Sequence, residues 1–175
     1  MTAETIAQPS AAQAGAPTPD EMRRVLGHFA TGVTVVTGID DEGPVGFACQ
    51  SFASVSLDPP LILICADHRG RAWPRIRKTG RFCVNVLHEE QSDLCARFGS
   101  SRGRKYEDLE WDLSDWNTPS LPGVLIRVHA EVHNVHVAGD HDIVIGRVLE
   151  LDTVSDERPM LFFRGKFGIE APSLS

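Results

Sequence analysis

Short runs of β-branched and apolar residues dominate this sequence, and their period is the feature that most constrains its fold. These predicted strands cover residues 33–37, 45–51, 61–65, 82–87, 124–137, 143–154 and 160–167. The continuous apolar runs 61–65 and 82–87 are typical of fully buried strands. Helical segments are few, and strands do not alternate with helices as they do in a parallel βαβ sheet. The sequence therefore predicts a mainly β fold, an antiparallel barrel with a few peripheral helices.

Three short segments carry helical signals instead. The first begins at Thr18, which together with Glu21 has the pattern of a capping box. Gly32 is expected to end this helix. Its apolar residues recur at helical spacing and form one stripe, at Met22, Val25, Leu26 and Phe29. Two further helices are expected over residues 71–79 and about 89–98, each followed by a glycine.

The 175 residues fit a single domain with a short tail. Residues 1–17 are rich in Ala, Gln, Pro and Thr and lack apolar periodicity, so we expect a disordered tail before a domain over residues 18–175. Residues 99–122 are polar and interrupted by Gly and Pro, which predicts a long loop. The alternation of the strand over 124–137 slips near Asn134, which indicates a β-bulge.

Charge and cysteine content limit the possible partners. The net charge is -7 and the pI about 5.4, so an attraction to nucleic acid is not expected. No apolar run reaches the ~20 residues that a membrane helix needs, and the N-terminus lacks the pattern of a secretory signal. The four cysteines, Cys49, Cys65, Cys83 and Cys95, have no metal-binding spacing. We therefore expect a cytoplasmic protein with reduced thiols and no membrane partner.

Three segments carry residues that suit a ligand site. Residues 46–60 crowd small and hydroxylated side chains between two strands, and such residues let backbone amides and hydroxyls approach a phosphate. Residues 30–37 combine a helix stop with a strand, and His141 opens a strand after the turn at 138–140. By composition alone, residues 46–60 are better explained as a Ser-rich loop without a ligand, and His141 as a surface histidine in a turn. No segment therefore decides the function by itself.

Other polar groups have simpler interpretations. His129 and His133 share one face of a predicted strand, but four residues span about 13 Å, too far for one metal ion, and His136 faces elsewhere. No metal site is therefore expected, and the absence of a G-x-G-x-x-G motif argues against a Rossmann dinucleotide site. The cations within residues 69–81 and 102–105 either attract ligand phosphates or keep these segments solvated. The three tryptophans are expected to be packing residues.

In their order and spacing, these segments resemble the flavin reductase domain family, which supplies reduced flavin to two-component aromatic and steroid hydroxylases. The resemblance runs from Met22 to about Glu170. Its marks are "RRVLGHFATGVTVVT", "PVGFACQSFASVSLDPPLILIC", "GRFCVNVL", "ARFGS", "GDHDIVIGRV" and "LFFRGKFG". The resemblance implies a split β-barrel of the FMN-binding type that holds flavin at a homodimer interface.

The same resemblance implies a set of flavin-binding residues, namely Thr34, Cys49, Gln50, Ser51, Ser54, Ser56, Asn85, Val86, Leu87, Arg97 and Phe98. Thr34 and the stretch from Cys49 to Ser51 would border the isoalloxazine ring. Ser54 and Ser56 would approach the ribityl phosphate. The 85–87 stretch would pass beside the flavin. Arg97 and Phe98 would close over its phosphate or adenine end. His141 would position the nicotinamide. Many relatives have Thr or Ser where this chain has Cys49, and a thiol is a poorer hydrogen-bond donor.

The implied activity is hydride transfer from NADH or NADPH to FMN or FAD, followed by release of the reduced flavin to a partner monooxygenase. Such chemistry belongs to the cofactors, while the protein supplies orientation and electrostatics, which fits the lack of a catalytic triad or carboxylate pair. Two alternatives stay open at this point: an enzyme of the pyridoxamine-phosphate oxidase type, and a non-catalytic flavin-binding protein. The sequence does not distinguish FMN from FAD or NADH from NADPH.

Overall fold

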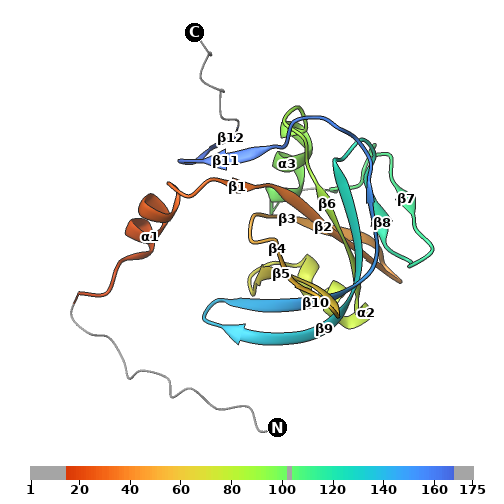
Figure 1. The fold of residues 1–175 in the computed structure, drawn as a ribbon, viewed down its shortest axis with the longest axis horizontal. Helices are drawn as coiled ribbons and strands as arrows, with labels where there is room; N and C mark the ends of the chain where they lie inside the picture. Colours follow the sequence, from red (N-terminus) through yellow and green to blue (C-terminus); the bar gives the residue numbers. More distant parts are fainter. Residues whose placement is uncertain (1–14, 102–103, 168–175) are drawn as a thin grey trace, which may run out of the picture.

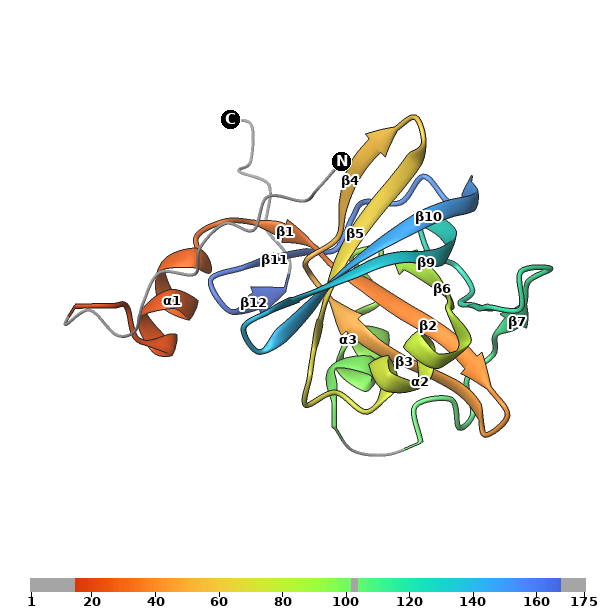
Figure 2. The same cartoon turned by 90° about the horizontal axis from the view of Figure 1, so that it is seen from below.

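A computed structural model describes residues 15–101 and 104–167 of the chain, so the predicted tail over 1–17 lies mostly outside the described residues (Figure 1). The seven main strands are β2 (Thr34–Asp40), β3 (Gly43–Cys49), β4 (Ala53–Leu57), β5 (Pro60–Asp67), β6 (Arg81–Val86), β9 (Ile126–Ala138) and β10 (His141–Thr153). They form one antiparallel sheet in the order β3-β2-β6-β9-β10-β5-β4. The sheet curls so that β3 returns close to β5, as Figure 2 shows. The predicted antiparallel barrel is confirmed.

Five shorter strands complete the sheet structure. They are β1 (Thr31–Gly32), β7 (Asp112–Leu113), β8 (Pro119–Ser120), β11 (Leu161–Phe163) and β12 (Lys166–Phe167). The single strand predicted over 160–167 is wrong, because Arg164 and Gly165 have φ angles of 49° and 78° and turn the chain back as a tight hairpin. The loop predicted over 99–122 contains the small β7–β8 pair.

The helices are α1 (Pro19–Leu26), α2 (Ala72–Thr79) and α3 (Ser92–Gly99). The capping box of α1 is confirmed, since the Thr18 hydroxyl accepts the Glu21 N–H at 3.2 Å and the Glu21 carboxylate accepts the Thr18 N–H at 2.8 Å. The end predicted at Gly32 is wrong, because α1 stops at Leu26 and Gly32 lies in β1. The α3 helix begins later than predicted because residues 88–91 form a turn.

Two apolar clusters form the core. The first fills the barrel around the fully buried Phe82 and is covered at one end by Trp73 and Ile76 of α2. The second lies beneath α3. The barrel interior is tightly filled: a Cβ added at Gly146 would lie 2.6 Å from the Phe82 ring. Of the two strands predicted to be fully buried, β6 is buried along most of its length, whereas β5 packs only alternate residues into the barrel.

Other sequence predictions fare differently. The bulge near Asn134 is confirmed, because Asn134 pairs with Ile145 whereas Val132 pairs with Gly146. The segment over 46–60 is not one loop, because it contains the end of β3, the whole of β4 and the first residue of β5. Among the described residues, no helix is long and apolar enough to cross a membrane.

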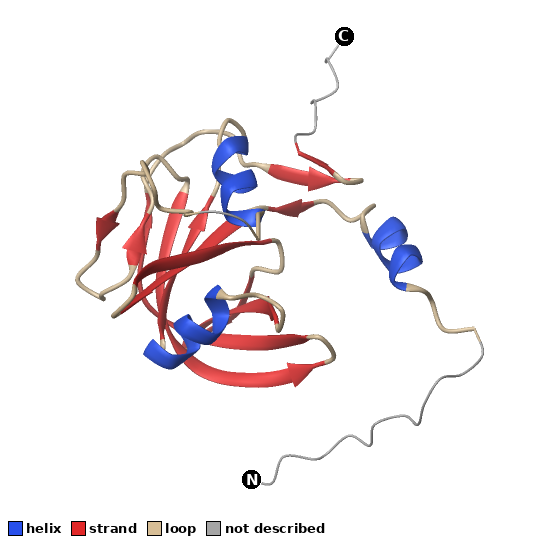
Figure 3. Cartoon of the chain, turned by 180° about the vertical axis from the view of Figure 1, so that it is seen from behind, coloured by secondary structure: helices blue, strands red, loops and turns tan. Residues whose placement is uncertain are grey.

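The apolar stripe of α1 does not pack on the barrel. Figures 1 and 3 show α1 standing apart from the sheet, and none of its residues is buried. All four residues of the predicted stripe are exposed, with Phe29 at 74%. Three residues of the predicted stripe, Met22, Val25 and Leu26, lie on α1, whereas Phe29 lies beyond its end, and the described residues leave this stripe uncovered.

Candidate functional site

A groove follows the outer edge of β3, the terminal strand of the main sheet. Its larger part, a cavity of about 1060 Å³, lies between β3, the segment that links β5 to α2, and described residues of the 98–107 stretch. Its smaller part, of about 420 Å³, lies between the end of β3, the end of β5 and the start of β10. The two cavities share Phe47, Ala48 and Asp67, so we treat them as one feature, the β3 groove.

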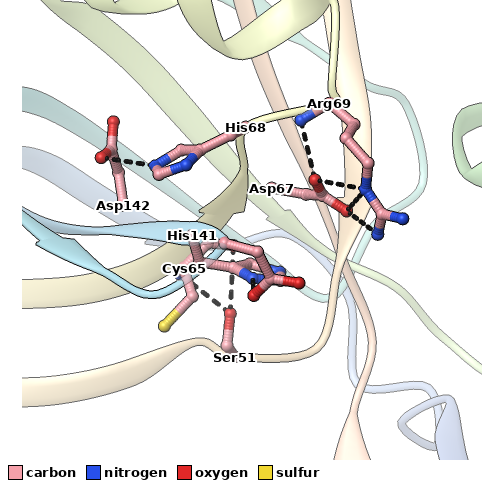
Figure 4. Close-up of polar contacts among 8 residues, drawn as sticks. Ser51, Cys65, Asp67, His68, Arg69, His141 and Asp142 are labelled. Carbon is pink, nitrogen blue, oxygen red and sulfur yellow. Dashed lines mark hydrogen bonds and ion pairs between the residues drawn. The ribbon is translucent and has the colours of Figure 1, made fainter. Parts of the chain in front are cut away.

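Hydrogen bonds of Ser51 close the barrel at the floor of the smaller cavity. The Ser51 hydroxyl accepts the Cys65 N–H at 2.8 Å and lies 3.4 Å from the Cys65 carbonyl, which it reaches as a donor (Figure 4). The Thr34 hydroxyl donates to the Cys49 carbonyl at 2.8 Å. Burial raises the pKa of the Cys49 thiol, so this group is a neutral wall of the cavity rather than a nucleophile.

His141 stands on the opposite wall, at the first residue of β10. Its Nδ1 lies 2.8 Å from a carboxylate oxygen of Asp140, and the hydrogen bond lowers the pKa of that carboxyl. Its side chain is 39% exposed, and the contact with Asp140 leaves Nε2 as the ring nitrogen free to meet a ligand. Asp67, between the two walls, is held by Arg69 at 2.7 Å, which lowers the pKa of its carboxyl.

The buried carboxylate of Asp142 ties α2 to the start of β10. It accepts the Trp73 indole N–H at 2.8 Å, lies 2.9 Å from His68 Nε2 and accepts from Arg77 at 3.2 Å. The hydrogen bond from Trp73, followed by that from His68, lowers the pKa of Asp142. This network fixes the backbone next to His141, and it confirms Trp73, which is only 3% exposed, as a packing residue.

Two cations at the larger cavity, Lys105 and Arg71, have no carboxylate partner among the described residues. The Lys105 ammonium donates to the carbonyls of Gly46 and Phe98 at 3.0 and 2.8 Å, and Arg71 donates to the Ser101 carbonyl. Burial, together with repulsion from Arg71, lowers the pKa of Lys105.

Within the described part of the chain, neither of these cations joins an ion pair, whereas several neighbouring arginines do. The sequence left the role of both residues open, and only the fold shows that they line one cavity. The signal for Arg71 was its place in the basic run over 69–81, and for Lys105 its place in the long loop.

The structure brings some of the predicted site residues together and separates others. Those that line the groove are Cys49, Gln50, Ser51, Phe98 and His141. Thr34 is buried directly beneath the Cys49 carbonyl.

The remaining predicted site residues do not line the groove. Ser54 and Ser56 lie on β4 at the other end of the sheet, and Arg97 donates to the Glu107 carbonyl from the exposed side of α3. The 85–87 stretch follows the interior, where Asn85 and Leu87 are fully buried.

The histidines on β9 do not form a metal centre in the described structure. His129 is buried, and its Nδ1 lies 2.7 Å from the Thr118 hydroxyl, while burial lowers its pKa. In residues 15–101 and 104–167, no three His, Cys, Asp or Glu side chains gather as metal ligands.

Comparison with known proteins identifies the fold. Residues 26–170 match the family described as the flavin reductase like domain. The chain belongs to this family. A flavin reductase relative, the reductase subunit HsaB of a flavin-dependent monooxygenase from Rhodococcus jostii, is 50% identical over 87% of this chain and 78% of its own length. The FMN reductase (NADH) SmoA from Agrobacterium fabrum is 42% identical over 83% of each chain. The family predicted from the sequence is confirmed.

Solved flavin reductase structures share the architecture. A homolog of nitrilotriacetate monooxygenase component B from Mycobacterium thermoresistibile has a TM-score of 0.84 and 46% identity, covering 89% of this chain and 88% of that one. The NADH:FAD oxidoreductase SgcE6 of Streptomyces globisporus, in complex with NAD and FAD fragments, has a TM-score of 0.84 and 32% identity. The match covers 94% of this chain and 100% of that one.

Proposed function

We propose that this chain is an NAD(P)H-dependent flavin reductase that reduces FMN or FAD and releases the reduced flavin to a partner monooxygenase. The observation that carries the proposal is the smaller cavity of the β3 groove. The residues expected beside the flavin ring, Cys49 to Ser51, form one wall, and His141, expected on the nicotinamide side, forms another. These residues are far apart in the sequence, yet they face the same space.

The residues present fit a flavin. A polar donor, the Gln50 amide, lies at the smaller cavity, where the polar edge of a flavin ring needs one. The cations Arg71 and Lys105 lie at the larger cavity, where a phosphate would be neutralised. When bound, flavin supplies the hydride-accepting chemistry, and the nicotinamide supplies the hydride.

The residues of the chain orient the two ligands and shape the cavity around them, and take no chemical part in the hydride transfer. The contact with Asp140 fixes the ring of His141, so that Nε2 can hold the nicotinamide, whose reactive carbon must come within about 3–3.5 Å of its acceptor. The hydrogen bonds of Ser51 fix the distance between the walls by joining the end of β3 to β5. The protonated Cys49 thiol keeps its wall neutral.

We further propose that the protein is a homodimer. The stripe of α1 and the exposed side chains of β4, Val55 at 47% and Leu57 at 91%, leave apolar surface that the described residues of one chain do not cover. Surfaces of this kind mark interfaces. Ser54 and Ser56 lie on the same strand, so a second copy would bring them into a shared site, as the family resemblance implies. Four free cysteines are in keeping with a cytoplasmic location.

We propose that the remaining predicted residues support the site indirectly, either by shaping the groove or by holding the segments around it. Thr34 and Phe98 shape the groove from beneath, since one supports the Cys49 carbonyl and the other packs against Gly46. Asn85, Val86 and Leu87 act through the core that supports β2, and Arg97 acts by holding the Glu107 backbone at the rim of the larger cavity.

The test is anaerobic NADH and NADPH oxidation by the full chain, with FMN and FAD in parallel. We expect nicotinamide consumption that depends on added flavin and bleaching of the flavin absorbance at the same rate. A flavin-binding protein without turnover would bind flavin and leave NADH unchanged. Oxidation of pyridoxamine phosphate in place of NADH would instead indicate the oxidase alternative.

A further inference from the structure

Both chain neighbours of His141 are held by one residue of the turn between β5 and α2. The His68 N–H donates to the Asp140 carbonyl at 3.0 Å and continues the pairing of β5 with β10 beyond the ends of both strands. The His68 ring is directed to Asp142, and its Nε2 lies 2.9 Å from a carboxylate oxygen (Figure 4). His68 therefore contacts the chain on both sides of His141, while it lines neither described cavity of the β3 groove.

The position of His141 in its hairpin makes this support important. His141 is the first residue of β10 and directly follows the turn of Gly139 and Asp140 at the end of the β9–β10 hairpin. Successive side chains of a strand point to opposite faces, so the buried Asp142 faces the barrel while His141 faces the smaller cavity. A shift of the backbone at either neighbour would therefore move the imidazole in the cavity.

The two carboxylate oxygens of Asp142 have different partners. One oxygen accepts the Trp73 indole N–H at 2.8 Å and an Arg77 N–H at 3.2 Å, and both donors belong to α2. The other oxygen meets His68, and because an ionised carboxylate only accepts, the His68 Nε2 carries the hydrogen. The contacts with α2 hold the helix on the end of the barrel, whereas the contact with His68 joins the carboxylate to the turn beside the groove. Loss of the His68 ring should therefore leave the barrel end intact.

We infer that His68 is a positioning residue for hydride transfer, which acts through Asp140 and Asp142 to fix the His141 imidazole beside the nicotinamide. The inference rests on the proposed function, in which His141 meets that ligand. A misplacement of about 1 Å near the reacting atoms can lower a rate about 10²-fold. Because His68 lines neither described cavity, its loss should change the rate of reaction with the nicotinamide and leave the affinity for flavin unchanged.

The test compares His68→Ala with His68→Gln and with the control His88→Ala. All three variants keep the backbone N–H of residue 68, and the glutamine amide can donate to Asp142 as the imidazole Nε2 does. His88 is a matched control because its Nδ1 also makes one hydrogen bond, from the Glu90 N–H at 3.3 Å, and it lines neither described cavity. At saturating flavin, kcat/KM for NADH should fall about tenfold in His68→Ala and stay within about twofold of the wild type in the other two variants.

The flavin Kd and the Tm of each variant separate positioning from a general structural role. We expect an unchanged flavin Kd in all three variants. The inference is overturned if kcat/KM for NADH is unchanged in His68→Ala, if His68→Gln loses as much as His68→Ala, or if the flavin affinity falls by the same factor as kcat/KM. In each of these cases the wild type would still oxidise NADH with flavin, so the proposed function would stand. A wild type that binds flavin and leaves NADH unchanged would refute the proposed function, and this inference with it.

Discussion

The role of Asn85, either in the core or beside the flavin, can be decided by replacing its buried amide. Asn85 is 0% exposed, and its Nδ2 donates to the Val35 carbonyl and the Thr37 hydroxyl, both at 3.1 Å. Its Oδ1 accepts the Leu121 N–H at 2.9 Å. The family resemblance implies that this residue lies beside the flavin, whereas its contacts are those of a core side chain that joins β2, β6 and the segment before β9.

Asn85→Ala should therefore destabilise the protein without weakening flavin binding. The Leu121 N–H loses its buried acceptor, which costs about 1–3 kcal/mol. The space left by the amide adds roughly 1 kcal/mol. For a chain of this size, a total of about 2–4 kcal/mol corresponds to a fall in Tm of roughly 5–15 °C. The flavin KM of the folded variant, measured well below its Tm, should stay within about twofold of the wild type.

The matched control is Asn134→Ala, the same chemical change at the exposed bulge of β9. The Asn134 amide oxygen accepts the N–H of the adjacent Val135, so its loss should change stability by less than about 0.5 kcal/mol. Thermal unfolding and flavin titration of both variants decide the matter. An unchanged Tm with a severalfold weaker flavin affinity for Asn85→Ala would place this side chain in the cofactor site and refute the assignment to the core.

Three further predictions concern the site and its surroundings. His141→Ala should lower kcat/KM for NADH by about 10²-fold and leave the flavin Kd unchanged; an equal loss of both would place the histidine on the flavin side. Sedimentation should give twice the chain mass of 19.2 kDa, and the double change Leu26→Ser and Phe29→Ser should shift this toward the monomer; a wild-type monomer with full activity would contradict the dimer. Deletion of residues 1–17 should leave Tm and turnover unchanged, because the capping box begins at Thr18; a large loss of either would show that the tail docks on the domain.

The periodicity of the sequence predicts the main strands well, because a barrel strand repeats its pattern over many residues. Segments of two or three residues carry no such period, which is why β7 and β8 were missed. The Arg164–Gly165 hairpin was missed for a related reason: its strands are short, and arginine rarely adopts the positive φ that the turn requires. The end of α1 was placed too late because Phe29 continues the apolar spacing beyond Leu26, where the helix ends.

The site could be predicted only in part, because its parts meet through the order of strands. Residues 49–51 and His141 come together because β5 pairs with β10 while Ser51 bonds to Cys65, and neither pairing is written in the local sequence. A polar residue within an apolar run, such as Asn85, can either contact a ligand or be hydrogen-bonded within the core. Its hydrogen bond to the distant Leu121 N–H indicates the core role, and the local sequence does not reveal this partner. Of the residues that the family resemblance implies, Cys49, Gln50, Ser51, Phe98 and His141 line the β3 groove and the others do not, so their roles stay predictions.

The central claim is that the protein reduces flavin and lets it go, and transfer through a dialysis membrane tests this most directly. The reductase, NADH and flavin are placed anaerobically on one side, and cytochrome c or a flavin-dependent oxygenase on the other. We predict reduction of the acceptor across the membrane at a rate that rises with flavin concentration. Reduction that occurs only when both proteins share one compartment would show that the flavin stays bound, and would contradict the account.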